Sequence, residues 1–210
     1  MSDMSLHHTS AAPASMSAAA EAKRADNYKF AMWLYLASEV VLFMVFIGAY
    51  AIMRLNEPDI VKQVHESANI FLVSANTFLL LTSSWAMVMG LREIQHGNAA
   101  GLIRWFQFTA LLGVIFMIGQ YIEYSDLARE GITINFADNE WQTFGMHFYV
   151  PTFFHGLHVL VGVLWCLGVA RNAARGGYSA TRYVGVEVFG LYWHFVDVVW
   201  IILFTLIYLL

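Results

Sequence analysis

Charged residues are scarce in this sequence of 210 residues: they make up 12% of it, whereas soluble domains carry roughly a quarter. No block of basic residues occurs and the formal net charge is −4, so nothing in the sequence predicts a nucleic-acid partner. The single cysteine, Cys166, lies inside an apolar run. One cysteine excludes both a disulfide framework within the chain and a cysteine-rich metal site.

Apolar residues, in contrast, make up 59% of the chain and give it a mean hydropathy of +0.58. They gather in five long runs, at residues 30–53, 68–89, 103–122, 144–170 and 184–210. About 20 helical residues cross a hydrocarbon core of roughly 30 Å. Only helices or closed barrels satisfy their backbone groups there, and these runs are too long and continuous for barrel strands. The sequence therefore predicts an all-α fold, an integral membrane bundle of five transmembrane helices.

The first 28 residues differ in composition from the rest, because Ala, Ser, Met and Thr dominate them. They hold too little apolar surface to offset the entropy of ordering. We interpret residues 1–28 as a flexible cytoplasmic tail and residues 29–210 as the membrane domain.

The basic residues between the runs predict the orientation. With the N-terminus inside, the inner segments hold eight Lys or Arg residues and the outer loops hold three, which together account for all eleven. We therefore expect a cytoplasmic N-terminus and a C-terminus at the outer face of the membrane.

Ionisable side chains at membrane depth cost about 2.5–3.5 kcal/mol on insertion scales, so each one needs a reason. Glu39 lies near the middle of the first run, which contains no basic residue before Arg54. Because desolvation disfavours an unpaired ion there, two roles are open: a carboxyl that binds a polar group or exchanges protons, or a neutral acid bonded to a neighbouring helix. Glu123 and Glu187 lie closer to the ends of their runs, where we expect better hydration.

The fourth and fifth runs hold most of the other ionisable side chains: His147, His155, His158, Glu187, His194 and Asp197. Histidines in membrane helices raise the question of haem or copper ligation. The first three runs contain no histidine, so a bis-histidine site between helices has few candidates. Glu187 and His194, seven residues apart, share a helix face. We favour a hydrogen-bonded polar seam between the fourth and fifth runs over a metal site.

Four motifs resemble those of subunit III of the haem-copper respiratory oxidases. WHFVDVVW at residues 193–200 is a specific, ungapped match, and FHGLHV at residues 154–159 is a second strong one. QYIEY at residues 120–124 is similar to the Q-x-x-EY pattern of the family, and Ser38-Glu39 to its intramembrane SE pair. The resemblance covers the whole predicted membrane domain. Longer family members have seven helices, and this chain resembles the shorter bacterial form that lacks the first two.

The resemblance implies a non-catalytic core subunit of a proton-pumping terminal oxidase of the cytochrome c oxidase type, in a bacterial inner (plasma) membrane. It implies no haem or copper in this chain, because those centres belong to partner subunits, and packing beside catalytic subunit I and subunit II. Bound phospholipid, support of proton uptake and an electron donor such as cytochrome c, at the level of the complex, are also implied.

The resemblance marks six intramembrane positions as candidates for packing, lipid contact or proton handling instead of metal ligation: Glu39, His155, His158, Glu187, His194 and Asp197. The sequence leaves other functions open. They are subunit III of a quinol oxidase, the accessory subunit of a nitric oxide reductase, a small membrane cytochrome, and a free-standing transporter that uses Glu39 as its carrier.

Overall fold

The computed structural model describes residues 12–58, 61, 69–129 and 142–209. Its helices are α1 (Ala12–Asn56), α3 (Ile70–Gln95), α4 (Ala99–Arg129), α5 (Gln142–Ala174) and α6 (Val184–Phe204), the last continued by a π-helical turn, η1 (Thr205–Leu209). Within these residues, five helices are long and apolar enough to cross a membrane. The prediction of an all-α bundle with five transmembrane helices is confirmed, and the chain is a multi-pass membrane protein.

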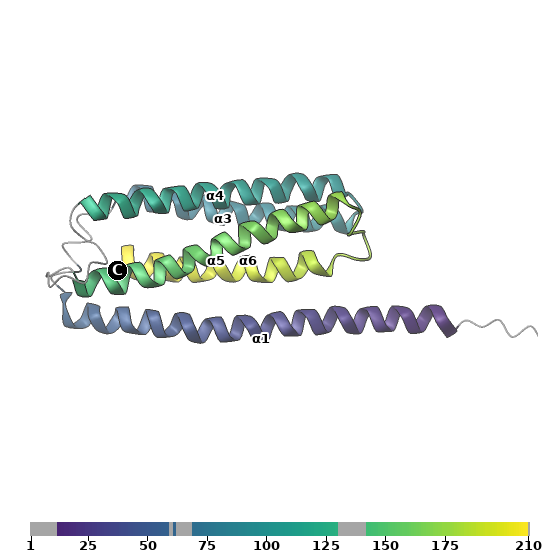
Figure 1. Ribbon diagram of the computed structural model, residues 1–210, viewed down its shortest axis with the longest axis horizontal. Coiled ribbons are helices and arrows are strands. Elements are labelled where there is room, and N and C mark those ends of the chain that lie inside the picture. Colours follow the sequence, from purple (N-terminus) through teal and green to yellow (C-terminus); the bar gives the residue numbers. More distant parts are fainter. Residues whose placement is uncertain (1–11, 59–60, 62–68, 130–141, 210) are drawn as a thin grey trace, which may run out of the picture.

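The first helix is much longer than a membrane crossing requires. It begins at Ala12, so residues 12–28 continue α1 as helix, while residues 1–11 lie outside the described part of the chain. Figure 1 shows the N-terminal part of α1 reaching past the ends of the other helices. The division of the chain at residue 28 stays a prediction.

The other helices pack as consecutive neighbours. α3 and α4 form a hairpin whose turn contains Gly97, with a φ of 80° that favours glycine. The side chain of Asn98 then accepts a hydrogen bond from the Gly101 N–H at 3.0 Å, at the start of α4. α5 packs on α4 and α6, α6 also packs on α3, and α1 lies against α5 and α6 (Figure 1).

Two tryptophans of the WHFVDVVW motif join α6 to α3. The Nε1–H of Trp193 donates to Ser83 Oγ, and that of Trp200 donates to Thr77 Oγ1, each at 3.0 Å. Both indole rings are fully buried. Because the partner positions rise along α6 and fall along α3, the two helices run antiparallel, as the second and fifth crossings of a five-span chain must.

The ring of Trp193 lies in a slot between α4 and α5 that two glycines leave open. A Cβ at Gly162 would lie 2.5 Å from Trp193 Cζ3, and a Cβ at Gly113 would lie 3.2 Å from Trp193 Cη2. Small residues at such positions let membrane helices approach closely, which is the source of their van der Waals packing. The motif is therefore part of the packing core of the bundle.

Candidate functional site

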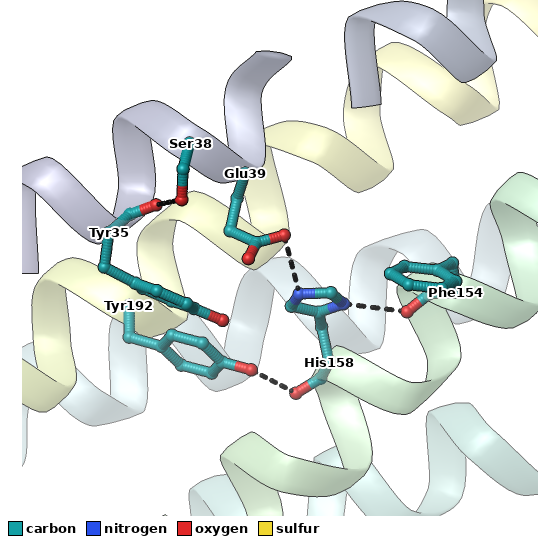
Figure 2. Close-up of polar contacts among 6 residues, drawn as sticks. All are labelled: Tyr35, Ser38, Glu39, Phe154, His158 and Tyr192. Carbon is teal, nitrogen blue, oxygen red and sulfur yellow. Dashed lines mark hydrogen bonds and ion pairs between the residues drawn. The ribbon is translucent and has the colours of Figure 1, made fainter. Parts of the chain in front are cut away.

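The intramembrane carboxyl of α1 has a partner on another helix. Figure 2 shows Glu39 pointing from α1 toward His158 of α5, with Glu39 Oε2 at 3.3 Å from His158 Nε2. Both side chains are largely buried, with 15% and 11% of their areas exposed. The two atoms are at ion-pair distance, although they lack the alignment of a hydrogen bond. Glu39 is thus paired across the α1–α5 contact with His158, whereas its own apolar run contains no basic residue.

The backbone of α5 fixes how His158 presents its ring. His158 Nδ1 lies 2.8 Å from the carbonyl oxygen of Phe154 (Figure 2). A carbonyl only accepts, so Nδ1 carries a proton, and Nε2 is the nitrogen that faces Glu39. One proton can then reside on Glu39 Oε2 or on His158 Nε2, which gives a neutral contact or an ion pair. This arrangement is able to hold or release a proton at a defined place.

Two tyrosines enclose this pair. The Tyr35 ring of α1 stacks on the Tyr192 ring of α6, with centroids 6.4 Å apart, and Tyr192 Oη donates to the His158 carbonyl oxygen at 2.9 Å (Figure 2). Both phenols interact electrostatically with the Glu39 carboxyl. The pair therefore lies where α1, α5 and α6 meet, and each helix contributes to it.

His155 occupies a different environment although it is only three residues from His158. Its ring stacks on Trp200 with centroids 5.0 Å apart and meets the edge of Phe116 at 6.0 Å. The residue is 1% exposed, and neither ring nitrogen forms a hydrogen bond within the described part of the chain. His155 serves here as an aromatic packing residue between α4, α5 and α6.

The three candidates on α6 lie along its contacts with α1 and α3. Glu187 Oε2 forms an ion pair with Lys29 Nζ of α1 at 2.8 Å. His194 Nδ1 lies 2.6 Å from Ser84 Oγ of α3. Asp197 is 4% exposed. Glu187 and His194 do share a face of α6, as their spacing predicts, because both line one hollow beside α1 and α3.

That hollow continues into a second one, and together we call them the α6 groove. The two hollows have volumes of about 280 and 530 Å³ and share Trp33, Leu191 and His194 as lining residues. Lys29 and Glu187 line one end, and the rest of the lining is apolar apart from His194. The groove therefore combines a charged end with an apolar interior.

The expected polar seam between the fourth and fifth spans differs from the observed contacts. Among the described side-chain hydrogen bonds, one joins α5 to α6: Tyr192 Oη donates to the backbone carbonyl oxygen of His158. The ionisable side chains instead pair with α1 and α3: His158 with Glu39, and His194 with Ser84. Since rotation of each helix about its axis decides which neighbour a side chain faces, spacing along one helix could not predict these pairs.

Comparison with known proteins gives the family. The family model described as cytochrome c oxidase subunit III matches residues 10–210. The chain belongs to this family. It is 42% identical over 186 residues to cytochrome c oxidase subunit 3 of Synechocystis sp., covering 88% of this chain and 76% of that protein. It is 38% identical to the protein of the same name from Thermostichus vulcanus, with 84% of each covered. Its identity to quinol oxidase subunit 3 of Bacillus spizizenii is 30%, over 85% of this chain and 84% of that protein.

The family confirms the resemblance that the motifs indicated. This subunit III chain is part of a terminal oxidase complex that reduces oxygen, and it assembles with other subunits of that complex. Within the described residues, no group of three or more His, Cys, Asp or Glu side chains could hold a metal ion. That the subunit III chain carries no redox centre stays a prediction, tested below.

One buried carboxyl of subunit III was wrongly predicted from the sequence. Glu123 was expected to be well hydrated near a span end, yet it is 1% exposed. α4 continues past it to Arg129, and Glu123 interacts electrostatically with Tyr149 and Tyr208. The signal that could have found it is the Q-x-x-EY motif itself, since its two polar positions fall three residues apart on one helix face.

Proposed function

We propose that this chain is the subunit III of a proton-pumping terminal oxidase in a bacterial plasma membrane, with cytochrome c as electron donor of the complex. It packs beside catalytic subunit I and subunit II, which hold the haem and copper. Its own roles are to stabilise the catalytic subunit, to hold phospholipid and to support proton uptake. The N-terminus is cytoplasmic and the C-terminus lies at the outer face, and no nucleic acid takes part.

The α6 groove is the observation that carries the phospholipid role. A phospholipid has a charged headgroup and apolar chains, and the groove has a charged end, Lys29 with Glu187, and an apolar interior. The Lys29 side chain is 40% exposed, and its ammonium has three N–H donors. It can therefore donate to a headgroup phosphate while it keeps its ion pair with Glu187. The apolar lining would hold one acyl chain by van der Waals packing, because the chain enters the groove from the lipid bilayer and not from water.

Filling the groove tests the phospholipid role. Ala37 lines the groove, so Ala37→Trp places a large ring where an acyl chain would lie. Ala31 is exposed on the same helix and is absent from the groove lining, so Ala31→Trp is the matched control. We expect the purified Ala37→Trp complex to retain less phospholipid per haem than the control complex. Equal phospholipid in the two complexes would contradict a lipid in this groove.

The Glu39–His158 pair is the observation that supports proton handling. Glu39→Gln keeps the size and hydrogen-bonding capacity of the side chain but removes its titratable proton. We expect normal assembly, because the amide keeps the contact with His158. We expect only a small loss of pumping, because the carboxyl supports proton uptake without being essential to it. Glu57→Gln, which removes an exposed carboxyl just beyond the end of α1, is the control. A Glu39→Gln complex that assembles fully yet loses all pumping would show that the carboxyl is essential.

The electron donor is decided by the complex that the chain joins. The relatives named cytochrome c oxidase subunit 3 support cytochrome c, whereas the Bacillus spizizenii relative is named for quinol oxidation. Capture of the chain in mild detergent, followed by mass spectrometry of its partners and turnover with each donor, separates the two. We expect subunits I and II and oxidation of reduced cytochrome c. Turnover with quinol alone would move the chain to the quinol oxidases.

A further inference from the structure

A hollow of about 250 Å³ lies between α4 and α5 and shares no lining residue with the α6 groove. We call it the α4–α5 hollow. Four of its lining residues are aromatic: Phe116, Tyr121 and Tyr124 of α4, and Phe153 of α5. Gln120 of α4 adds an amide to the same lining. The α4–α5 hollow therefore combines four aromatic rings with one carboxamide.

The Gln120 amide is buried, and its hydrogen-bonding capacity is unused. The residue is 6% exposed, and neither Nε2 nor Oε1 has a hydrogen-bond partner within the described residues. The phenols of Tyr124 and Tyr208 interact with it electrostatically, but Tyr124 Oη donates to Thr152 Oγ1, at 2.7 Å. Gln120 belongs to the apolar run of residues 103–122, where the membrane supplies no water. Because an unpaired buried amide is costly, this position favours a lipid-soluble partner.

The aromatic residues give the hollow a fixed wall and a movable rim. The Phe116 ring is fully buried and meets the Trp200 ring edge-on, with centroids 4.8 Å apart. Tyr121 and Phe153, in contrast, are 73% and 56% exposed, so their rings are free to turn. Aromatic rings attract one another in offset-stacked and edge-to-face arrangements. The lining therefore suits a flat aromatic ring better than a flexible acyl chain.

The amide indicates which group that ring carries. To engage both amide atoms of Gln120 at one point, a ligand needs a group that accepts from Nε2–H and donates to Oε1, as a hydroxyl does, whereas a carbonyl only accepts. Leu157 and Leu160 continue the lining along α5 and are 40% and 38% exposed, so an apolar tail can pass over them into the bilayer. A hydroxyl on an aromatic ring with an apolar tail is the chemistry of a quinol.

We propose that the α4–α5 hollow binds a quinol, whose ring lies among the aromatic side chains and whose hydroxyl pairs with Gln120. The hydroxyl oxygen accepts from Nε2–H, and the hydroxyl hydrogen is donated to Oε1. A transmembrane helix of a partner subunit is about 10–12 Å across and does not fit into a hollow of about 250 Å³. No electron is transferred in this binding, so it is independent of whether the complex oxidises cytochrome c or quinol.

Photolabelling of the purified complex locates the ligand. The probe is a decyl-benzoquinol whose tail carries a diazirine, used in oxygen-free buffer, and mass spectrometry identifies the labelled peptide, which we expect to contain Leu157 and Leu160. Gly156 lines the hollow and has no heavy atom within 4 Å of a built Cβ, so Gly156→Leu extends into the hollow. Gly168 of the same helix is equally open but outside the lining, so Gly168→Leu is the matched control. The label should fall by about 10-fold in Gly156→Leu and stay at the wild-type level in the control.

Gln120→Met separates recognition by the amide from packing, because methionine keeps the length of the side chain without the amide. In the wild-type complex, unlabelled quinol should prevent labelling of the α5 peptide about 5-fold better than the matching quinone, which engages one amide atom instead of two. Gln120→Met should remove that preference, whereas a purely structural role of Gln120 would leave it intact. Label absent from α4 and α5, label undiminished in Gly156→Leu, or equal competition by quinol and quinone in the wild type would overturn the proposal.

Discussion

The slot that holds Trp193 makes Gly162→Ala a demanding test of the packing. The new Cβ would lie 2.5 Å from Trp193 Cζ3 and 2.7 Å from Cε3, distances that real Cβ contacts do not show. The indole cannot easily move away. Its Nε1–H is held by Ser83 Oγ at 3.0 Å, and on the other side the Gly113 backbone closes the slot. The strain must therefore be relieved by separating α5 from α6 or by breaking the bond to Ser83.

The expected size follows from two opposing contributions. Inserting a methyl group into a packed core costs about 1–3 kcal/mol. Replacing glycine by alanine in a helix stabilises the folded state by up to about 1 kcal/mol, because alanine has the higher helix propensity. Gly168 lies on the same helix, is exposed and has no heavy atom within 4 Å of a built Cβ, so Gly168→Ala gains propensity without the clash. The difference between the two variants, about 1–3 kcal/mol, isolates the clash.

The assay is thermal unfolding of the purified oxidase complex, with the amount of subunit III retained as a second measure. For a chain of this length, 1 kcal/mol corresponds to a shift in Tm of about 2–4 °C. Gly162→Ala should therefore lower the Tm of subunit III by about 2–12 °C relative to Gly168→Ala. Equal Tm values and equal retention for the two variants would refute the tight slot, and with it the arrangement of α5 and α6 described above.

Two further predictions concern the whole chain. The chain purified free of all other subunits should show no haem absorption and no stoichiometric copper. Nδ1 of His158 contacts the Phe154 carbonyl, Nδ1 of His194 contacts Ser84, and the described residues hold no group of three or more potential metal ligands. A retained haem or copper would refute this. Reporter fusions after Gly97 should lie in the cytoplasm and fusions after Asn56 outside, as the distribution of basic residues predicts; a consistent inversion would reject the orientation.

The number of spans, the helical class and the family could all be predicted from the sequence. The thickness of the hydrocarbon core and the need to satisfy backbone groups in it act on each run separately, so run length alone is sufficient. The motifs at residues 193–200 and 154–159 are contiguous in the sequence, so they can be recognised without the structure. Helix ends are less predictable: the third apolar run ends at residue 122, whereas α4 continues to Arg129.

Which polar side chains meet was decided only by the tertiary structure. Glu39 had no candidate partner in its own run, and His158 of α5 supplied one. His194 could be assigned to a helix face, but its bond to Ser84 of α3 depends on how α3 and α6 are rotated and aligned. Burial of Glu123 depends in the same way on which face of α4 meets its neighbours. Spacing along one helix fixes the angle between its own side chains, and it carries no information about the rotation and register of the helix packed against it.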